Sequence, residues 1–188
     1  MYQVNYENCT NLKEFFKESM SQLADGYVEE YPTYLLKIQD YMKQCESYRE
    51  LGTNQGASAS AVMLTNPKYV ELIDKSFSRF NPSKHLFDQY ANDNNIGFML
   101  HEESSVSVKT DIKTDFLLVD SVHKYKHVKK EIELYEPLTT KFILFHDTVG
   151  FPGVGKAVQE FVNSNKDWEL HFHLDHPQAG YTVTKRTT

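Results

Sequence analysis

The sequence predicts a doubly wound α/β fold whose sheet has seven strands, is mostly parallel and ends in an antiparallel hairpin. The chain has 188 residues, about the length of one domain. From Tyr48 onward, short apolar runs alternate with stretches of helical periodicity, which favours βαβ units. Two alternating runs, 168–174 and 181–185, then follow each other across a polar loop, and this pattern indicates a hairpin.

The first 46 residues predict two helices that cover the core as part of the same domain. Asn11 followed by Glu14 is typical of a capping box, and apolar residues recur near one face of this first helix. Pro32 suits the first turn of a second helix. Residues 47–188 are the predicted core.

The same periodicity predicts each element of the core. The expected parallel strands are 47–51, 69–73, 96–100, 116–119 and 141–145. The expected helices are 56–64, 83–92, 124–136 and 154–163. In an open α/β sheet, ligands bind at the carboxyl ends of the strands. The residues that follow each strand are therefore the candidate site.

Composition and charge argue against several classes of partner. The 20 Lys and Arg and 26 Asp and Glu give a formal net charge of −6, which would repel nucleic acid. No apolar stretch approaches the ~20 residues that span a bilayer, so no membrane partner is expected. Cys9 and Cys45 form no CxxC pair and indicate a reducing compartment. We expect a cytoplasmic protein that is a monomer or a homodimer.

A loop with two glycines follows the first predicted strand, in the order Glu50-Leu51-Gly52-Thr53-Asn54-Gln55-Gly56-Ala57-Ser58. Glycine lets a backbone turn tightly and approach a ligand closely. Asp74 ends the next strand, at about the separation from Glu50 where an acid binds the hydroxyls of a ribose. The alternative is a tight turn beside a surface carboxylate.

Polar side chains also follow the fourth and fifth predicted strands. They are Asp120, His123, His146 and Asp147. Because these strands are neighbours, the carboxylates of Asp120 and Asp147 are expected to converge on one divalent cation, with His146 as a third ligand. The alternative is that both aspartates cap the helices that follow.

Residues 150–156 match the GxxxxGK part of a phosphate-binding P-loop, which makes a P-loop-like nucleotide-binding protein a more remote alternative. Ala157 stands where that loop needs a hydroxyl for Mg²⁺, and too few residues follow to build the usual sheet.

From Tyr48 to Arg186 the chain resembles the class I S-adenosylmethionine (SAM)-dependent methyltransferases. Within them it is most similar to the small metal-dependent O-methyltransferases of the catechol O-methyltransferase-like and cephalosporin-hydroxylase-like family. The motifs that carry the resemblance are RELGTNQGAS, VELIDKS, FLLVDSVHKYKHVKKEIELYEPL and FILFHDTVGFPGV. The resemblance implies a Rossmann-like fold, SAM as cofactor, a small-molecule acceptor, and Mg²⁺ or Mn²⁺ at Asp120, His146 and Asp147.

The resemblance also assigns the cofactor contacts. It places Glu50, Gly52, Asn54 and Ser58 at the methionine part, Asp74 at the ribose and Ser104 at the adenine, with Gly56 and Asp120 also at the cofactor.

Two residues depart from the pattern of catechol-type enzymes. His123 stands where those enzymes carry a lysine, and its imidazole can take a proton near neutral pH, so His123 and Asp120 are the predicted catalytic residues. His146 stands where they carry an acid, and imidazole favours Mn²⁺, Fe²⁺ or Zn²⁺ over Mg²⁺. The expected reaction is metal-assisted methylation of a hydroxyl oxygen. A SAM-binding protein without catalytic activity is the alternative.

Overall fold

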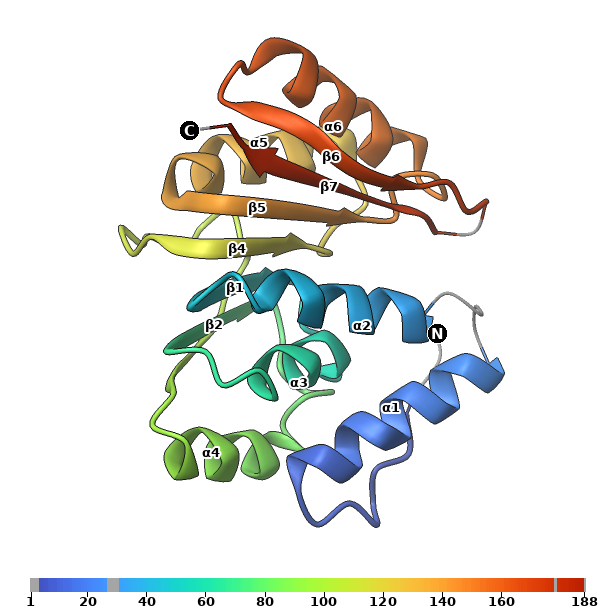
Figure 1. Ribbon diagram of the computed structural model, residues 1–188, viewed down its shortest axis with the longest axis vertical. Helices are drawn as coiled ribbons and strands as arrows, with labels where there is room; N and C mark the ends of the chain where they lie inside the picture. The colour runs from blue at the N-terminus through green and yellow to red at the C-terminus, as the bar shows by residue number, and fades with distance from the viewer. Residues whose placement is uncertain (1–3, 27–30, 178, 188) are drawn as a thin grey trace.

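The protein is described here by a computed structural model that covers residues 4–26, 31–177 and 179–187. Figure 1 shows one twisted sheet with helices packed on both faces. The strands lie in the order β3-β2-β1-β4-β5-β7-β6. They are Ser47–Leu51 (β1), Tyr69–Asp74 (β2), Gly97–Glu102 (β3), Thr114–Val119 (β4), Thr139–His146 (β5), Trp168–Leu174 (β6) and Tyr181–Arg186 (β7).

Strands β1 to β5 are parallel, and β7 pairs antiparallel with both β5 and β6. The predicted fold class is therefore confirmed. Of the predicted hairpin loop, Gln178 lies outside the described residues. The chain runs outward from β1 to β3 and then returns to β4 on the other side of β1. Ligands bind at such a reversal of strand order, at the carboxyl ends of the strands.

Helices cover the two faces of the sheet in two groups. Leu12–Gly26 (α1), Tyr31–Met42 (α2), Ala57–Met63 (α3) and Lys84–Asp93 (α4) pack on one face, while Tyr125–Tyr135 (α5) and Pro152–Ser164 (α6) pack on the other. A short 3-10 helix, Glu136–Leu138 (η1), follows α5. Each face of the sheet has its own hydrophobic core. Because side chains alternate along a strand, Tyr48 and Val70 lie in the core under α1 to α4, and Leu51 and Ile73 lie in the core under α5 and α6.

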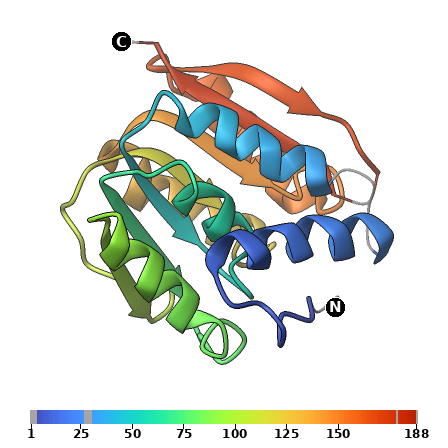
Figure 2. The same cartoon turned by 60° about the horizontal axis from the view of Figure 1, so that its bottom comes forward.

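The two N-terminal helices lie side by side over the face that also carries α3 (Figure 2). Their apolar residues, including Phe15 and Ile38, share one core with the sheet. The start of α1 has the predicted cap, since the amide of Glu14 donates to Oδ1 of Asn11 at 3.0 Å. The Glu14 carboxylate accepts from the amide of Thr10 at 2.7 Å, one residue before the position expected in a capping box.

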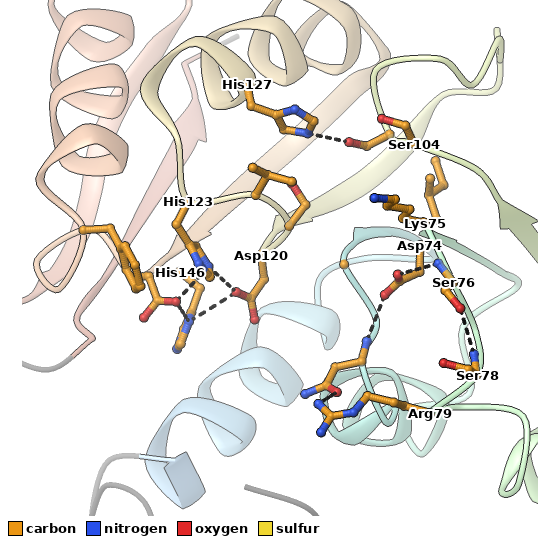
Figure 3. A pocket seen from close by; sticks show the side chains of 18 of the residues that line it. Asp74, Lys75, Ser76, Ser78, Arg79, Ser104, Asp120, His123, His127 and His146 are labelled. Atoms are coloured by element: carbon orange, nitrogen blue, oxygen red, sulfur yellow. Dashed lines mark hydrogen bonds and ion pairs between the residues drawn. The ribbon is translucent and has the colours of Figure 1, made fainter. Parts of the chain in front are cut away.

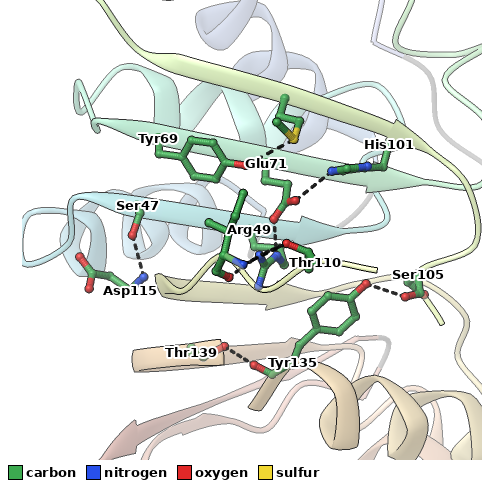
Figure 4. Close-up of polar contacts among 12 residues, drawn as sticks. Ser47, Arg49, Tyr69, Glu71, His101, Ser105, Thr110, Asp115, Tyr135 and Thr139 are labelled. Atoms are coloured by element: carbon green, nitrogen blue, oxygen red, sulfur yellow. Dashed lines mark hydrogen bonds and ion pairs between the residues drawn. The ribbon is translucent and has the colours of Figure 1, made fainter. Parts of the chain in front are cut away.

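Residues 103–113 join β3 to β4 as a loop without a helix. Arg49, fully buried on β1, is paired with Glu71 on β2, and its Nη2 donates to the carbonyl of Ile112 in this loop at 2.8 Å (Figure 4). His101 Nε2 lies 2.9 Å from the other oxygen of Glu71. This buried network fastens the loop, which begins at the ligand-binding edge, to the centre of the sheet.

The GxxxxGK segment forms no phosphate loop. Phe151 precedes α6, and Gly153, Gly155 and Lys156 lie inside this helix. A Cβ atom on Gly155 would lie 2.3 Å from the carbonyl oxygen of Thr148, so this glycine permits close packing of the helix. The P-loop alternative is therefore wrong. Across the described residues, no helix has the length and apolar character needed to cross a membrane.

Candidate functional site

A cavity of about 920 Å³ opens at the carboxyl ends of β1, β2, β4 and β5. Its lining includes eight of the predicted site residues, which are Gly52, Asn54, Asp74, Ser104, Asp120, His123, His146 and Asp147. Figure 3 shows Asp74 and Arg79 at one end and His123 and His146 at the other. Eight of the eleven predicted site residues therefore lie together at one edge of the sheet.

Gly52 brings the loop after β1 into contact with the end of β4. Its φ is +93°, and a Cβ atom on it would lie 2.2 Å from the carbonyl oxygen of Asp120. Only glycine adopts this conformation and this approach without strain. The loop backbone can therefore line the cavity directly beside Asp120.

Asp74 holds the same loop in place. Its Oδ2 accepts from the amides of Thr53 at 2.7 Å and Asn54 at 3.0 Å, and its Oδ1 accepts from the amide of Ser76 at 3.0 Å. A carboxylate has about four lone-pair sites, so this group retains capacity for a ligand hydroxyl. Asp74 thus shapes the loop and faces the cavity at once.

Glu50, Gly56 and Ser58 lie behind the cavity wall. Fully buried, Glu50 accepts hydrogen bonds from the hydroxyls of Tyr48 and Ser58, each at 2.7 Å. Burial raises its pKa to about 8, against the lowering effect of both hydrogen bonds. A Cβ atom on Gly56 would lie 2.9 Å from a ring atom of Phe80 and 2.9 Å from one of Phe87, so this glycine allows close packing. Direct cofactor contact by these residues stays a prediction.

Two aspartates and two histidines form a cluster at the other end of the cavity, hereafter the Asp/His cluster: Asp120, His123, His146 and Asp147. Ligand atoms of Asp120, His146 and Asp147 all lie within 4.8 Å of one another. His123 Nε2 lies 2.9 Å from Oδ2 of Asp147. Carboxylate oxygen and imidazole nitrogen together form a donor set that suits a divalent cation, so these residues fit a metal.

The pKa values in the Asp/His cluster reflect mutual attraction. Hydrogen bonds that His123 donates to the carboxylates of Asp120 and Asp147 raise its pKa to about 9. Burial alone would lower the pKa of His146, but the facing carboxylates outweigh it and raise that pKa to about 10. Burial alone would raise the pKa of both aspartates, and the histidines outweigh it and lower both. The cluster therefore concentrates negative charge that two imidazolium groups neutralise.

Packing fixes the orientation of both imidazoles. The ring of Phe151 stacks on His123 at 4.3 Å with an interplanar angle of 24°. The ring of Tyr34 from α2 lies 4.6 Å from that of His146, so the N-terminal part of the chain supports the site. Asp147 has a φ of 60°, a left-handed conformation that directs its carboxylate to the cluster.

A polar wall that the sequence analysis missed lies between the two ends of the cavity. Ser105 and His127 line it, and Oε1 of the buried Glu131 accepts from the hydroxyl of Ser105. His127 Nε2 lies 3.1 Å from that hydroxyl and 3.3 Å from the carboxylate. A catalytic triad would use one ring nitrogen for each partner, so this arrangement is no proton relay. The spacing of His127 and Glu131 on one helical face was the available signal.

Lys75, Ser76, Ser78 and Arg79 were also missed, although they follow Asp74 directly and line the cavity. Nη1 of Arg79 donates to Oδ1 of Asn54 at 2.8 Å. This contact ties the segment after β2 to the loop between β1 and α3, residues 52–56, hereafter the glycine loop.

No protein family description and no curated protein sequence matches this chain. Solved structures do match. The O-methyltransferase TomG from Streptomyces achromogenes, in complex with SAM, is 13% identical with a TM-score of 0.67, over 91% of this chain and 90% of that one. An O-methyltransferase from Bacillus cereus, in complex with S-adenosyl-L-homocysteine (SAH), is 11% identical with a TM-score of 0.69, over 97% of this chain and 94% of that one.

The N-methyltransferase NodS from Bradyrhizobium japonicum, in complex with SAH, is 11% identical with a TM-score of 0.62, over 95% of this chain and 100% of that one. At these identities the likeness establishes the fold. It is the fold of the class I SAM-dependent methyltransferases.

Proposed function

We propose that this chain is a SAM-dependent methyltransferase that methylates a hydroxyl oxygen of a small molecule with the help of a divalent cation. The observation that carries the proposal is the division of one cavity into two ends. The glycine loop and Asp74 lie at one end, and the Asp/His cluster lies at the other. Solved methyltransferases with this fold add support, since those named above hold SAM or SAH.

The first end suits the cofactor. Gly52 lets the loop backbone line the cavity beside Asp120, and Asp74 offers carboxylate oxygens to the ribose hydroxyls. Ser104 and Ser105 line the wall on which the adenine would lie. Asp120 borders both ends, so it would face the sulfonium charge from one side and the cation from the other.

The second end suits the acceptor. When bound, SAM supplies an activated methyl group, and a divalent cation supplies a Lewis acid that lowers the pKa of a hydroxyl. Asp120, His146 and Asp147 would hold that cation. Val122 and Phe151, both about two-fifths exposed, offer an apolar surface for the body of the acceptor. The chain contributes mainly by positioning the hydroxyl in line with the methyl group and by excluding water.

His123 has two roles open to it in this scheme. The sequence predicts that it removes the proton of the acceptor, and its place beside both aspartates also suits a metal ligand. The cytoplasmic location and the monomeric or homodimeric state stay predictions.

Calorimetric titration with SAH, in EDTA and with added Mn²⁺, tests the two ends separately. We expect SAH to bind in EDTA and a set of small hydroxyl compounds to be methylated only when the metal is present. Mass spectrometry of the products detects the added methyl group. SAH binding without turnover on hydroxyl or amine acceptors would favour a non-catalytic SAM-binding protein. Failure to bind SAH or SAM would refute the proposal.

A further inference from the structure

His123 faces the same two carboxylate oxygens as His146. Its Nε2 lies 2.9 Å from Oδ2 of Asp147 and 3.4 Å from Oδ1 of Asp120. Nδ1 of His146 lies 3.4 Å and 3.5 Å from those same two atoms. The four side chains come from the ends of β4 and β5 and from the turn that leads into α5.

Most of these separations match those of ligands around one small cation. Bonds from nitrogen and oxygen to such a cation are about 2.0–2.2 Å long, so adjacent ligands stand roughly 3.3–3.6 Å apart in a tetrahedron and 2.8–3.1 Å apart in an octahedron. Three of the four nitrogen-to-oxygen distances, 3.4, 3.4 and 3.5 Å, match the tetrahedral spacing, and the 2.9 Å contact between His123 and Asp147 would lengthen as both side chains bind one tetrahedral cation.

The packing of His123 argues for the same role. Phe151 covers one face of its ring, and Nε2 points at the two aspartates. A group whose task is to take a proton from the acceptor would direct its nitrogen toward the acceptor hydroxyl. Here the nitrogen is directed at the atoms that would surround the cation.

We propose that His123 binds the cation as a fourth ligand, beside Asp120, His146 and Asp147. Two imidazoles in the donor set favour a first-row transition metal such as Mn²⁺, Fe²⁺, Co²⁺ or Zn²⁺ over Mg²⁺, which prefers oxygen. The inference rests on the proposed function for the presence of a cation. It replaces the predicted role of His123 as base, because a lone pair that binds a metal cannot also take a proton.

Titration of the full chain with Co²⁺, without SAM or acceptor, tests this assignment by calorimetry and visible absorption. We expect the unmodified chain to bind Co²⁺ at least about 100-fold more tightly than Mg²⁺. His123→Ala should weaken Co²⁺ binding about tenfold or more and alter the visible band. His85→Ala removes an exposed histidine from α4 and should leave both unchanged. Equal Co²⁺ affinity in His123→Ala and the unmodified chain, or no preference for Co²⁺ over Mg²⁺, would overturn the assignment.

A measurement on the unmodified chain covers the case in which His123→Ala does not fold. Nitrogen NMR of the imidazole rings should show that Zn²⁺ shifts one ring nitrogen of His123 and one of His146. A shift confined to His146 would overturn the assignment.

Titration with SAH in EDTA separates this inference from the proposed function. If SAH binds and the Co²⁺ affinity is the same in His123→Ala as in the unmodified chain, the proposed methyltransferase stands and His123 is not a metal ligand. If Co²⁺ binding depends on His123 but SAH does not bind, the four-ligand metal site stands and the proposed methyltransferase function is refuted.

Discussion

Replacing Gly52 with alanine tests whether the glycine loop packs against the end of β4 only because Gly52 has no side chain. In the native conformation, with φ at +93°, the new Cβ atom would lie 2.2 Å from the carbonyl oxygen of Asp120 and 2.8 Å from Cα of Ser121. Both are backbone atoms, which cannot rotate away as a side chain can. Either the loop or the end of β4 must therefore move.

The expected cost has two parts. A left-handed conformation costs an alanine roughly 1–2 kcal/mol. Overpacking of a close contact costs about 1–3 kcal/mol more. The sum, about 2–5 kcal/mol, corresponds to a fall in unfolding temperature of roughly 4–20 °C for a chain of this size.

Thermal unfolding and SAH titration of Gly52→Ala measure both consequences. We expect the lower unfolding temperature and, because the loop no longer fits beside Asp120, an SAH affinity at least about tenfold weaker. Gly97→Ala is the matched control, since its Cβ atom would first meet the ring of Tyr69 at 3.1 Å, on β2 and away from the cavity. That control should change stability by less than about 1 kcal/mol. Native-like stability and SAH affinity in Gly52→Ala would refute the reasoning.

Three further substitutions test other parts of the site. Asp74→Ala removes the acceptor of three backbone hydrogen bonds and the predicted ribose ligand, so SAH should bind about 10- to 100-fold more weakly. Asp88→Ala, on the exposed side of α4, is the control and should not affect SAH binding. Asp147→Ala should abolish methyl transfer and keep SAH affinity within about threefold of the native value; equal loss of both would contradict two separate ends of the cavity. Glu50→Gln should flatten the pH dependence of stability. Burial raises the pKa of Glu50 from 4.5 to about 8, so its contribution is complete below pH 4.5 and is lost as the pH rises to 8. Denaturant unfolding from pH 5 to 8 without ligand should show that the free energy of unfolding of the variant rises relative to that of the native chain toward pH 8. Parallel plots of unfolding free energy against pH would argue against a buried neutral Glu50.

Much of the fold can be predicted because burial in an α/β sheet leaves a local pattern in the sequence. The segments that become β1, β2, β4 and β5 lie between two layers of helices, so most of their side chains on both faces are buried and apolar, apart from the buried Glu50 and the buried Arg49–Glu71 pair. In the final hairpin, β6 alternates because its face with Glu169, His171 and His173 is exposed. The start of α1 is readable for a similar reason, since Asn11 and Glu14 act within one helical turn.

The sequence alone also determines which residues can reach the site. Parallel strands end at one edge of the sheet, so Gly52, Asp74, Asp120 and Asp147 had to gather once the strands were placed. Their residue types then indicate a cofactor loop at one end and a cation at the other.

Only the tertiary structure decides which way each side chain points and what lies behind it. Glu50 is at the end of β1, yet it turns into the core and bonds to Tyr48. His127 and Ser105, remote in sequence, share a wall because the hydroxyl of Tyr135 on α5 donates to the carbonyl of Ser105 and holds the loop between β3 and β4 against this helix. His123 follows Asp120 by three residues, but its approach to Asp147 depends on how α5 and Phe151 pack. These outcomes depend on distances between segments far apart in the chain, and no local periodicity encodes such distances.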